Sequence, residues 1–119
     1  MGYYIHNQEQ RETSFNILSK NVKSVIKVIS ELDNGAISNE LNETLRKFGW
    51  EAENNEKGDV INIVFIGKKR GRDGELFTAI APFVEDGSYI EMEGEHNDMW
   101  RWAFEGGRMK EKSPTIVWE

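Results

Sequence analysis

Large apolar and charged side chains alternate in the segments Ser88–Gly94 and Met99–Phe104, and this alternation constrains the fold more than any other feature of the chain. Successive side chains of a strand point to opposite faces, so each segment is expected to place its apolar residues on one buried face. A third strand, Arg108–Trp118, is expected after a turn at Gly106-Gly107. This part of the chain is therefore predicted to be an antiparallel meander.

The loop within Glu95–Asp98 decides which residues of the first two strands face one another. A loop of three or five residues sets Met92 opposite Trp100 and Glu91 opposite Arg101. An even loop would instead place the glutamates against the tryptophans, because a one-residue slip reverses every face. We predict the odd loop, since it keeps all the large apolar side chains together.

Helical periodicity occupies the first half of the chain. The segment Lys20–Asp33 repeats apolar residues at helical spacing, with Ser19 as its expected N-cap and Asn34-Gly35 as its end. Its apolar stripe consists of Val22, Val25, Ile26, Ile29 and Leu32. A second helix is expected to be capped by Ser38 and to end before Gly49.

Extended segments surround these two helices. Tyr3–Asn7 is predicted to form a first strand, and Phe15–Leu18 a short second one. Trp50–Asn54 is a further predicted strand. Val60–Ile66 is the most strand-like segment of all, because it is rich in β-branched residues and almost continuously apolar.

A short helix from Glu75, ending near Pro82, completes the expected order of elements. That order is strand, helix, helix, strand, strand, helix and three strands. It predicts an α+β fold with an antiparallel sheet and the helices packed on one face of it. Because 119 residues is a common size for one domain, we expect a single α+β domain over residues 1–119.

Composition narrows the classes of function. The net charge of −6 disfavours a general nucleic-acid binder, which needs positive charge to displace counterions. The absence of cysteine excludes disulfides and thiolate chemistry. The first residues lack the features of a signal peptide, and no apolar stretch approaches the roughly 20 residues that cross a bilayer. We therefore expect a cytoplasmic protein.

The first candidate site is a basic, glycine-rich loop, Gly67–Gly74. It contains Lys68, Lys69, Arg70 and Arg72. The loop is expected to follow a buried strand and to open a helix, where free N–H groups and the helix dipole favour a phosphate group. Its spacing matches neither the P-loop nor the dinucleotide-binding motif, and a solvated loop without a ligand is the alternative.

The second candidate site is an acidic segment without lysine or arginine. Glu91, Glu93 and Glu95 fall at strand spacing on one face, and Asp98 follows them. Such a face would attract a protein partner with a basic surface. Carboxylates beside His96 could instead hold a divalent ion, or could simply guard a strand edge. We adopt the docking interpretation and expect no metal and no other cofactor.

Three segments carry a resemblance to known proteins. Glu75–Glu95, Trp100–Glu105 and Ile116–Trp118 together resemble small, uncharacterised single-domain proteins of bacteria and their phages. No activity is attached to that group. The resemblance therefore implies a bacterial or phage setting and supplies no catalytic residues.

Two classes of function fit these observations. The first is a small acidic protein without catalytic activity that binds a macromolecule, of the immunity or inhibitor type. The alternative is a module or small enzyme that acts on a phosphorylated ligand through the loop Gly67–Gly74. An enzyme is the less expected of the two, because His6 and His96 are the only histidines and no catalytic triad can be assigned.

Overall fold

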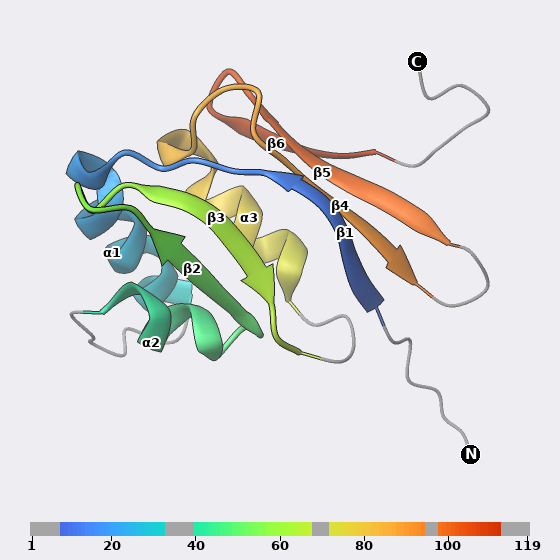
Figure 1. The fold of residues 1–119 in the computed structure, drawn as a ribbon, viewed down its shortest axis with the longest axis horizontal. Coiled ribbons are helices and arrows are strands. Elements are labelled where there is room, and N and C mark those ends of the chain that lie inside the picture. Colours follow the sequence, from blue (N-terminus) through green and yellow to red (C-terminus); the bar gives the residue numbers. More distant parts are fainter. Residues whose placement is uncertain (1–7, 33–39, 68–71, 95–97, 113–119) are drawn as a thin grey trace.

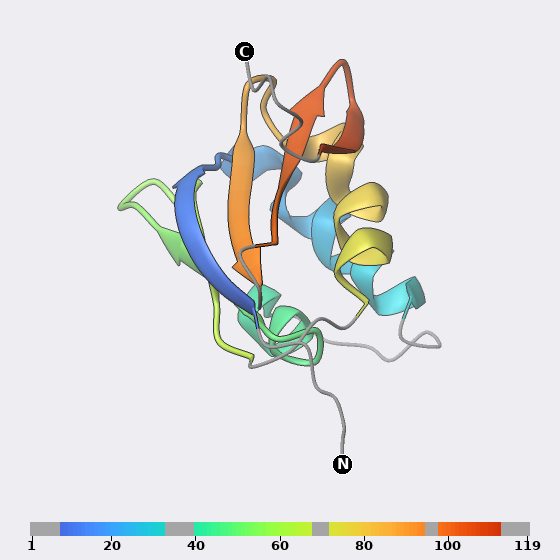
Figure 2. The same cartoon turned by 90° about the vertical axis from the view of Figure 1, so that its right-hand side faces the viewer.

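The computed structural model describes residues 8–32, 40–67, 72–94 and 98–112. Within these ranges the chain forms three α-helices and six antiparallel strands, so the predicted α+β fold is confirmed. Helices α1 and α3 lie on one side of the four-stranded sheet (Figures 1 and 2). The elements are β1 (Gln8–Ser14), η1 (Ser19–Asn21), α1 (Val22–Leu32), α2 (Leu41–Arg46), β2 (Trp50–Asn54), β3 (Val60–Phe65), α3 (Asp73–Ile80), η2 (Ala81–Phe83), β4 (Tyr89–Gly94), β5 (Met99–Glu105) and β6 (Arg108–Lys112).

The strands form a four-stranded sheet in the order β1-β4-β5-β6 and a two-stranded sheet of β2 and β3. In the larger sheet Met92 lies opposite Trp100 and Glu91 lies opposite Arg101, so the predicted odd-loop register is confirmed. Strands β5 and β6 are joined by Gly106 and Gly107, which have φ angles of +59° and +78°. Two successive positive φ angles are what a two-residue hairpin turn requires, and glycine adopts them without strain.

The two sheets meet along β1 and β3, which run side by side (Figure 1). Ile17 and Val60 form a single bridge there. Farther along, the Gln10 side chain replaces a strand partner. Its Nε2 donates to the Ile63 carbonyl at 2.7 Å, and its Oε1 accepts from the Phe65 N–H at 2.8 Å.

An amide side chain also covers the outer edge of β2. Asn42 of α2 accepts from the Ala52 N–H at 2.6 Å and donates to the Ala52 carbonyl at 3.2 Å. Both backbone groups of Ala52 that face away from β3 are thus hydrogen-bonded. Helix α2 thereby closes one edge of the smaller sheet.

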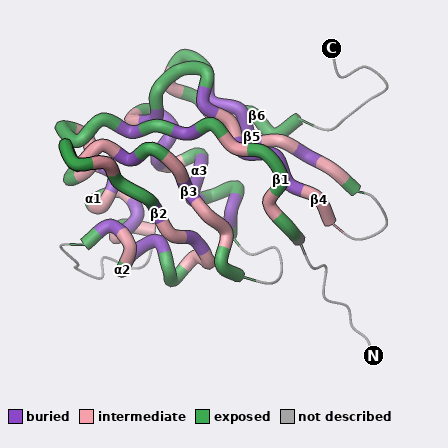
Figure 3. The backbone as a smooth tube through the Cα atoms, in the orientation of Figure 1, coloured by how far each residue is buried: buried purple, intermediate pink, exposed green. Residues whose placement is uncertain are grey.

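The core lies between the sheets and the helices (Figure 3). At its centre the Trp50 ring packs against Phe77 and Trp102, with ring centroids 5.0 and 6.0 Å apart. Helix α1 turns its predicted stripe toward this core: Val25 and Ile29 are fully buried, and Ile26 packs partly buried beside them. The large aromatic side chains of the described strands therefore serve mainly as core.

The start of the first helix differs from the prediction. Ser19 is not an N-cap, because it lies inside the η1 turn, and α1 itself begins at Val22. The Ser19 N–H donates to Oδ1 of Asp59, in the turn between β2 and β3, at 2.8 Å. Asp59, which is 40 residues away in the sequence, thus accepts a backbone hydrogen bond at the start of this helical segment, where Ser19 was predicted to be the cap. The predicted helix end at Asn34-Gly35 lies outside the described residues.

The first strand also differs from the prediction. Tyr3–Asn7 lies outside the described residues, whereas β1 comprises Gln8–Ser14, a segment without apolar alternation. This polar segment is extended because it pairs with β4, with a register shift between Gln10 and Thr13. The predicted short strand Phe15–Leu18 contributes only the bridge at Ile17.

The remaining elements follow the prediction more closely. Gly49 has a φ angle of +89° and lies three residues after α2, and its N–H bonds to the carbonyl of Arg46, the last residue of the helix. The predicted cap of α2 at Ser38 lies outside the described residues. Helix α3 begins at Asp73, two residues before the predicted start, and η2 contains Pro82. The described part of the last strand ends at Lys112.

Candidate functional site

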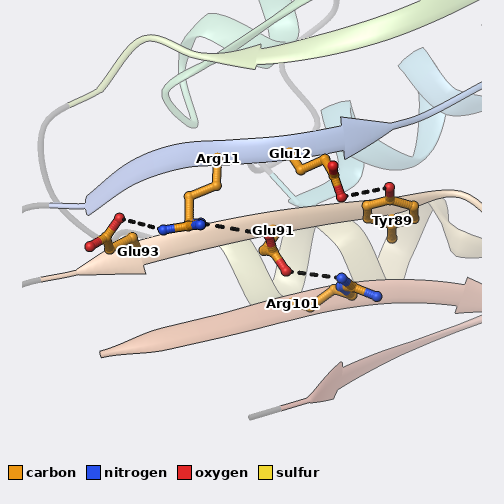
Figure 4. Close-up of polar contacts among 6 residues, drawn as sticks. All are labelled: Arg11, Glu12, Tyr89, Glu91, Glu93 and Arg101. Carbon is orange, nitrogen blue, oxygen red and sulfur yellow. Dashed lines mark hydrogen bonds and ion pairs between the residues drawn. The ribbon is translucent and has the colours of Figure 1, made fainter. Parts of the chain in front are cut away.

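One face of the four-stranded sheet is directed away from α1 and α3 (Figure 2). Charged side chains of β1, β4 and β5 form ion pairs on this face. Six residues from β1, β4 and β5 form a connected network there (Figure 4). They are Arg11, Glu12, Tyr89, Glu91, Glu93 and Arg101. We refer to these six residues as the charged network.

Glu91 lies at the centre of the charged network. It is only 7% exposed, although it sits on the face that points to solvent. Arg101 of β5 donates to its Oε2 at 2.9 Å, and Nε of Arg11 in β1 lies 3.6 Å from its Oε1. A carboxylate removed from water in this way requires compensating positive charge, and the two guanidinium groups supply it from both sides.

Tyr89 connects the two ends of the network. The guanidinium of Arg101 lies over its ring, 4.5 Å from the centroid, which is a favourable cation–π distance. The phenol donates to Oε1 of Glu12 at 3.0 Å. This hydrogen bond raises the pKa of Tyr89, so the phenol keeps its proton, and acts as a donor, to a higher pH than an ordinary tyrosine.

Arg11 is shared between two carboxylates. Its Nη1 donates to Glu93 at 3.0 Å, while its Nε faces Glu91 at 3.6 Å. The register shift in β1 between Gln10 and Thr13 lies at this point of the strand. Bulges of this kind redirect side chains, and Arg11 lies within this one. The network can thus hold guanidinium and carboxylate groups in fixed positions at the surface of the sheet.

The acidic candidate site is only partly as the sequence suggested. Glu91 and Glu93 do share one face of β4, as their spacing predicts (Figure 4). The acidic segment itself contains no lysine or arginine, but two arginines from other strands face its carboxylates: Arg101, as the predicted register requires, and Arg11, which was not predicted. Glu91 is moreover too buried to meet a partner directly.

The other acidic positions surround this network. Asp98 is exposed, and its carbonyl accepts from the Gly94 N–H at 2.7 Å. Glu9 of β1 is also exposed and lies directly opposite Glu93. We refer to Glu9, Glu93 and Asp98, which lie at one end of the sheet, as the acidic rim. Glu95 and His96 lie outside the described residues.

The basic candidate site can be described at one residue only, since Lys68, Lys69 and Arg70 lie outside the described residues. Arg72 is exposed and holds Glu75 of α3 through two hydrogen bonds of 3.1 and 2.7 Å. Its Nη2 also lies 3.3 Å from the Leu32 carbonyl, and its guanidinium lies over the Phe48 ring. Arg72 therefore fastens α3 to neighbouring elements.

The first turn of α3 is itself acidic. It contains Asp73 and Glu75, which already complement the positive end of the helix dipole. Asp73 is buried and accepts from the indole N–H of Trp50 at 2.8 Å. A phosphate group at this helix end would meet these two carboxylates as well as the cations of the loop.

A shallow opening between β1 and β3 is lined by Gln10, Arg11, Thr13, Asn62 and Val64. No group of three or more metal-ligating side chains comes together among the described residues. In the same ranges no helix is long and apolar enough to cross a membrane.

Comparisons with known proteins gave no relatives: no family model matches the chain, and neither the curated proteins nor the solved structures gave a match.

Only part of the charged network was predicted from the sequence. The pair of Glu91 and Arg101 was predicted, because both residues lie in one predicted hairpin. Arg11 and Glu12 were not singled out, since the polar run Gln8–Ser14 shows neither helical nor strand periodicity. Their one sequence signal is the mixture of both charge signs in that run. That signal is too common to identify a site.

Proposed function

We propose that this chain is a small, non-catalytic cytoplasmic protein that binds another protein, of the immunity or inhibitor type, in a bacterial or phage setting. The observation that supports this proposal is the charged network on the sheet face that the described helices leave uncovered. A buried Glu91 that holds two arginines makes no contribution to the apolar core. It does fix Arg11 and Arg101 in position before any partner arrives, which lowers the entropic cost of binding.

The charge of this face near β1 and β4 favours a basic partner. Five carboxylates, those of Glu12, Glu91 and the acidic rim, lie there together with the guanidinium groups of Arg11 and Arg101. The excess in this part of the face is negative, in line with the net charge of −6 for the chain. Complementary charge of this kind mainly speeds the encounter of two proteins and selects among partners.

The experiment compares two variants that remove the same number of carboxylates. The rim variant carries Glu9→Gln, Glu93→Gln and Asp98→Asn, and the control variant carries Glu53→Gln, Glu56→Gln and Glu85→Gln. Each is immobilised beside the wild type, and proteins are captured from a bacterial lysate at two salt concentrations. A protein that binds the wild type and the control variant, in a salt-sensitive manner, should bind the rim variant with a clearly slower association rate.

The opposite outcome is equally specific. If the captured protein associates with the rim variant as fast as with the wild type, the outer sheet face is not its docking surface. If none of the three proteins captures a partner but nucleotides or sugar phosphates raise the melting temperature of the wild type, the alternative function through Gly67–Gly74 is favoured instead.

A further inference from the structure

Strand β6 lies at the end of the four-stranded sheet, and among the described residues no strand pairs with its outer side. The other sheet borders are treated differently. The outer edge of β2 is closed by the Asn42 side chain, and the edge of β3 is met by Gln10. In the described part of the chain, no side-chain amide bonds to the outer edge of β6 in the way that Asn42 and Gln10 bond to the edges of β2 and β3.

The register shows which backbone groups β6 presents. Phe104 lies opposite Met109, but the Phe104 N–H and carbonyl both bond toward β4, to Ser88 and Gly87, at 2.9 Å each. In an antiparallel ladder, hydrogen-bonded and non-hydrogen-bonded pairs alternate, so Phe104 and Met109 form a non-hydrogen-bonded pair. The N–H and carbonyl of Met109 therefore point away from β5, toward the outer side of the sheet.

The side chains beside this position are positive. Met109 packs against the core, so Arg108 and Lys110 project from the opposite face of the strand, and Lys112 follows at the same spacing. All three are exposed. Within the described ranges Arg108 and Lys110 have no ion pair, and Lys112 has one distant contact of 4.0 Å with Glu105.

We propose that β6 accepts an acidic, extended segment of another protein, which joins the sheet as an additional strand opposite Met109. The backbone of such a segment bonds to the N–H and carbonyl of Met109. Its acidic side chains, at alternate positions on the solvent face, lie opposite Arg108 and Lys110. Strand addition of this type takes its affinity from the main chain and its selectivity from alternate side chains.

The same charges act against self-association. If two copies paired antiparallel through their β6 edges about Met109, Arg108 of one would lie opposite Lys110 of the other. Like charges directly opposite each other destabilise a sheet. Positive charge on an edge strand thus prevents pairing with itself while leaving the edge open to an acidic strand. This surface is separate from the acidic rim and does not depend on the function proposed above.

The test uses a fluorescently labelled peptide of about eight residues that alternates threonine and glutamate, a length typical of strands. One control peptide has lysine in place of glutamate. A second keeps the glutamates but is N-methylated on the backbone groups that would face β6. Binding is measured by fluorescence anisotropy with the wild type, with the double variant Arg108→Glu and Lys110→Glu, and with the matched variant Lys23→Glu and Lys27→Glu on α1. Circular dichroism checks the fold of each variant.

We expect the glutamate peptide to bind the wild type and the α1 variant equally well. The β6 variant should bind it at least about tenfold more weakly, because two favourable cross-strand charge pairs become repulsive. Neither control peptide should bind, and the amide resonance of Met109 should shift with the glutamate peptide. Three results would each overturn the proposal: no binding of the glutamate peptide at millimolar concentration, equal binding to a folded β6 variant, or equal binding of the N-methylated peptide.

Discussion

A carboxylate in the middle of a solvent-facing sheet is costly to dehydrate, and at Glu91 two guanidinium groups offset that cost. Arg101 approaches from β5 and Arg11 from β1, so a single side chain connects three strands. Glu93, two residues farther along β4, forms an ion pair with Arg11, and its side chain is 37% exposed. The two glutamates thus have the same chemistry but different surroundings, and this difference can be measured.

We expect Glu91→Gln to lower the free energy of unfolding by about 1–3 kcal/mol, because the partly buried arginines lose their counter-charge. Glu93→Gln should cost no more than about 1 kcal/mol, since an exposed ion pair contributes little. Urea unfolding of both variants beside the wild type measures the two losses. Equal losses would mean that Glu91 is not the centre of the network.

At the scale of single residues, the sequence predicted contacts between residues of one hairpin but not contacts with residues from other strands. Opposite positions for Glu91 and Arg101 follow from side-chain alternation and loop length alone. Arg11 lies 80 positions earlier in the chain than Glu91, in a strand without an apolar pattern. Residues that meet only through the folded sheet leave no local signal. The same holds for Asp59, which bonds to Ser19 in place of a local cap.

At the scale of elements, α1 shows how far periodicity reaches. The spacing predicted a helix and the face that it buries, and the structure confirms both. Periodicity does not show which residues of the stripe are most deeply buried. In the structure Val25 and Ile29 are fully buried, whereas Ile26 lies at the side of the stripe and stays partly exposed.

We therefore expect Ile29→Ala to lower the free energy of unfolding by about 2–5 kcal/mol, the usual range for a fully buried isoleucine. Ile26→Ala should cost less, because its side chain leaves a smaller cavity. Lys27→Ala, on the exposed face of the same helix, serves as the control and should change stability by no more than about 0.5 kcal/mol. A loss below about 1 kcal/mol at Ile29 would contradict the packing described here.

The loop Gly67–Gly74 allows a second prediction at this scale. If it binds phosphorylated ligands, the variant Lys69→Glu and Arg70→Glu should lose any ligand-induced stabilisation while keeping its fold. A ligand present at 100 times its dissociation constant raises stability by about 2.7 kcal/mol, which a thermal-shift assay detects readily. Arg72 is left unchanged because it anchors α3 through Glu75. If neither nucleotides nor sugar phosphates shift the melting temperature of the wild type, this alternative is excluded.

For the whole molecule, the sequence predicted the fold class and the hairpin register, but not how the two sheets join. The fold class and the hairpin register follow from apolar alternation and turn residues, which can be seen in the sequence. The junction depends on Gln10, whose amide bonds to the backbone of β3, and the outer edge of β2 is closed by the amide of Asn42. A polar side chain in the sequence gives no indication of which backbone it will meet. For the acidic candidate site, the sequence predicted that Glu91 and Glu93 share one face of β4, but not that Arg11 pairs with both of them.

The stability of the molecule at acid pH should depend on two carboxylates, those of the half-buried Asp59 and the exposed Glu75. A backbone hydrogen bond from Ser19 and a side-chain bond from Asn55 lower the pKa of Asp59, and the hydrogen bond from Arg72 lowers the pKa of Glu75. Both pKa values lie below those of the unfolded chain, so the stabilisation is complete above about pH 4 and disappears as the pH falls through the folded values. In the variant Asp59→Asn, the urea concentration at the midpoint of unfolding should therefore fall less steeply as the pH is lowered below about 4 than it does in the wild type. An equally steep fall for variant and wild type would contradict this.

The loss of stability at alkaline pH should depend on Tyr89, a member of the charged network. The hydrogen bond to Glu12 raises the pKa of its phenol above that of an unfolded tyrosine, about 10. The folded state therefore holds the proton more tightly, and the stabilisation is present below about pH 10 and disappears as the pH rises through the folded value. Tyr89→Phe keeps the ring beneath Arg101 but removes the ionisable group, so it should flatten the loss of stability above about pH 10 while lowering stability at neutral pH by roughly 1 kcal/mol. Urea midpoints from neutral to alkaline pH measure both effects, and Glu12→Gln should reproduce the first without removing the ring or its hydroxyl. If the alkaline limb of Tyr89→Phe runs parallel to that of the wild type, the bond between Tyr89 and Glu12 does not contribute to folding in solution.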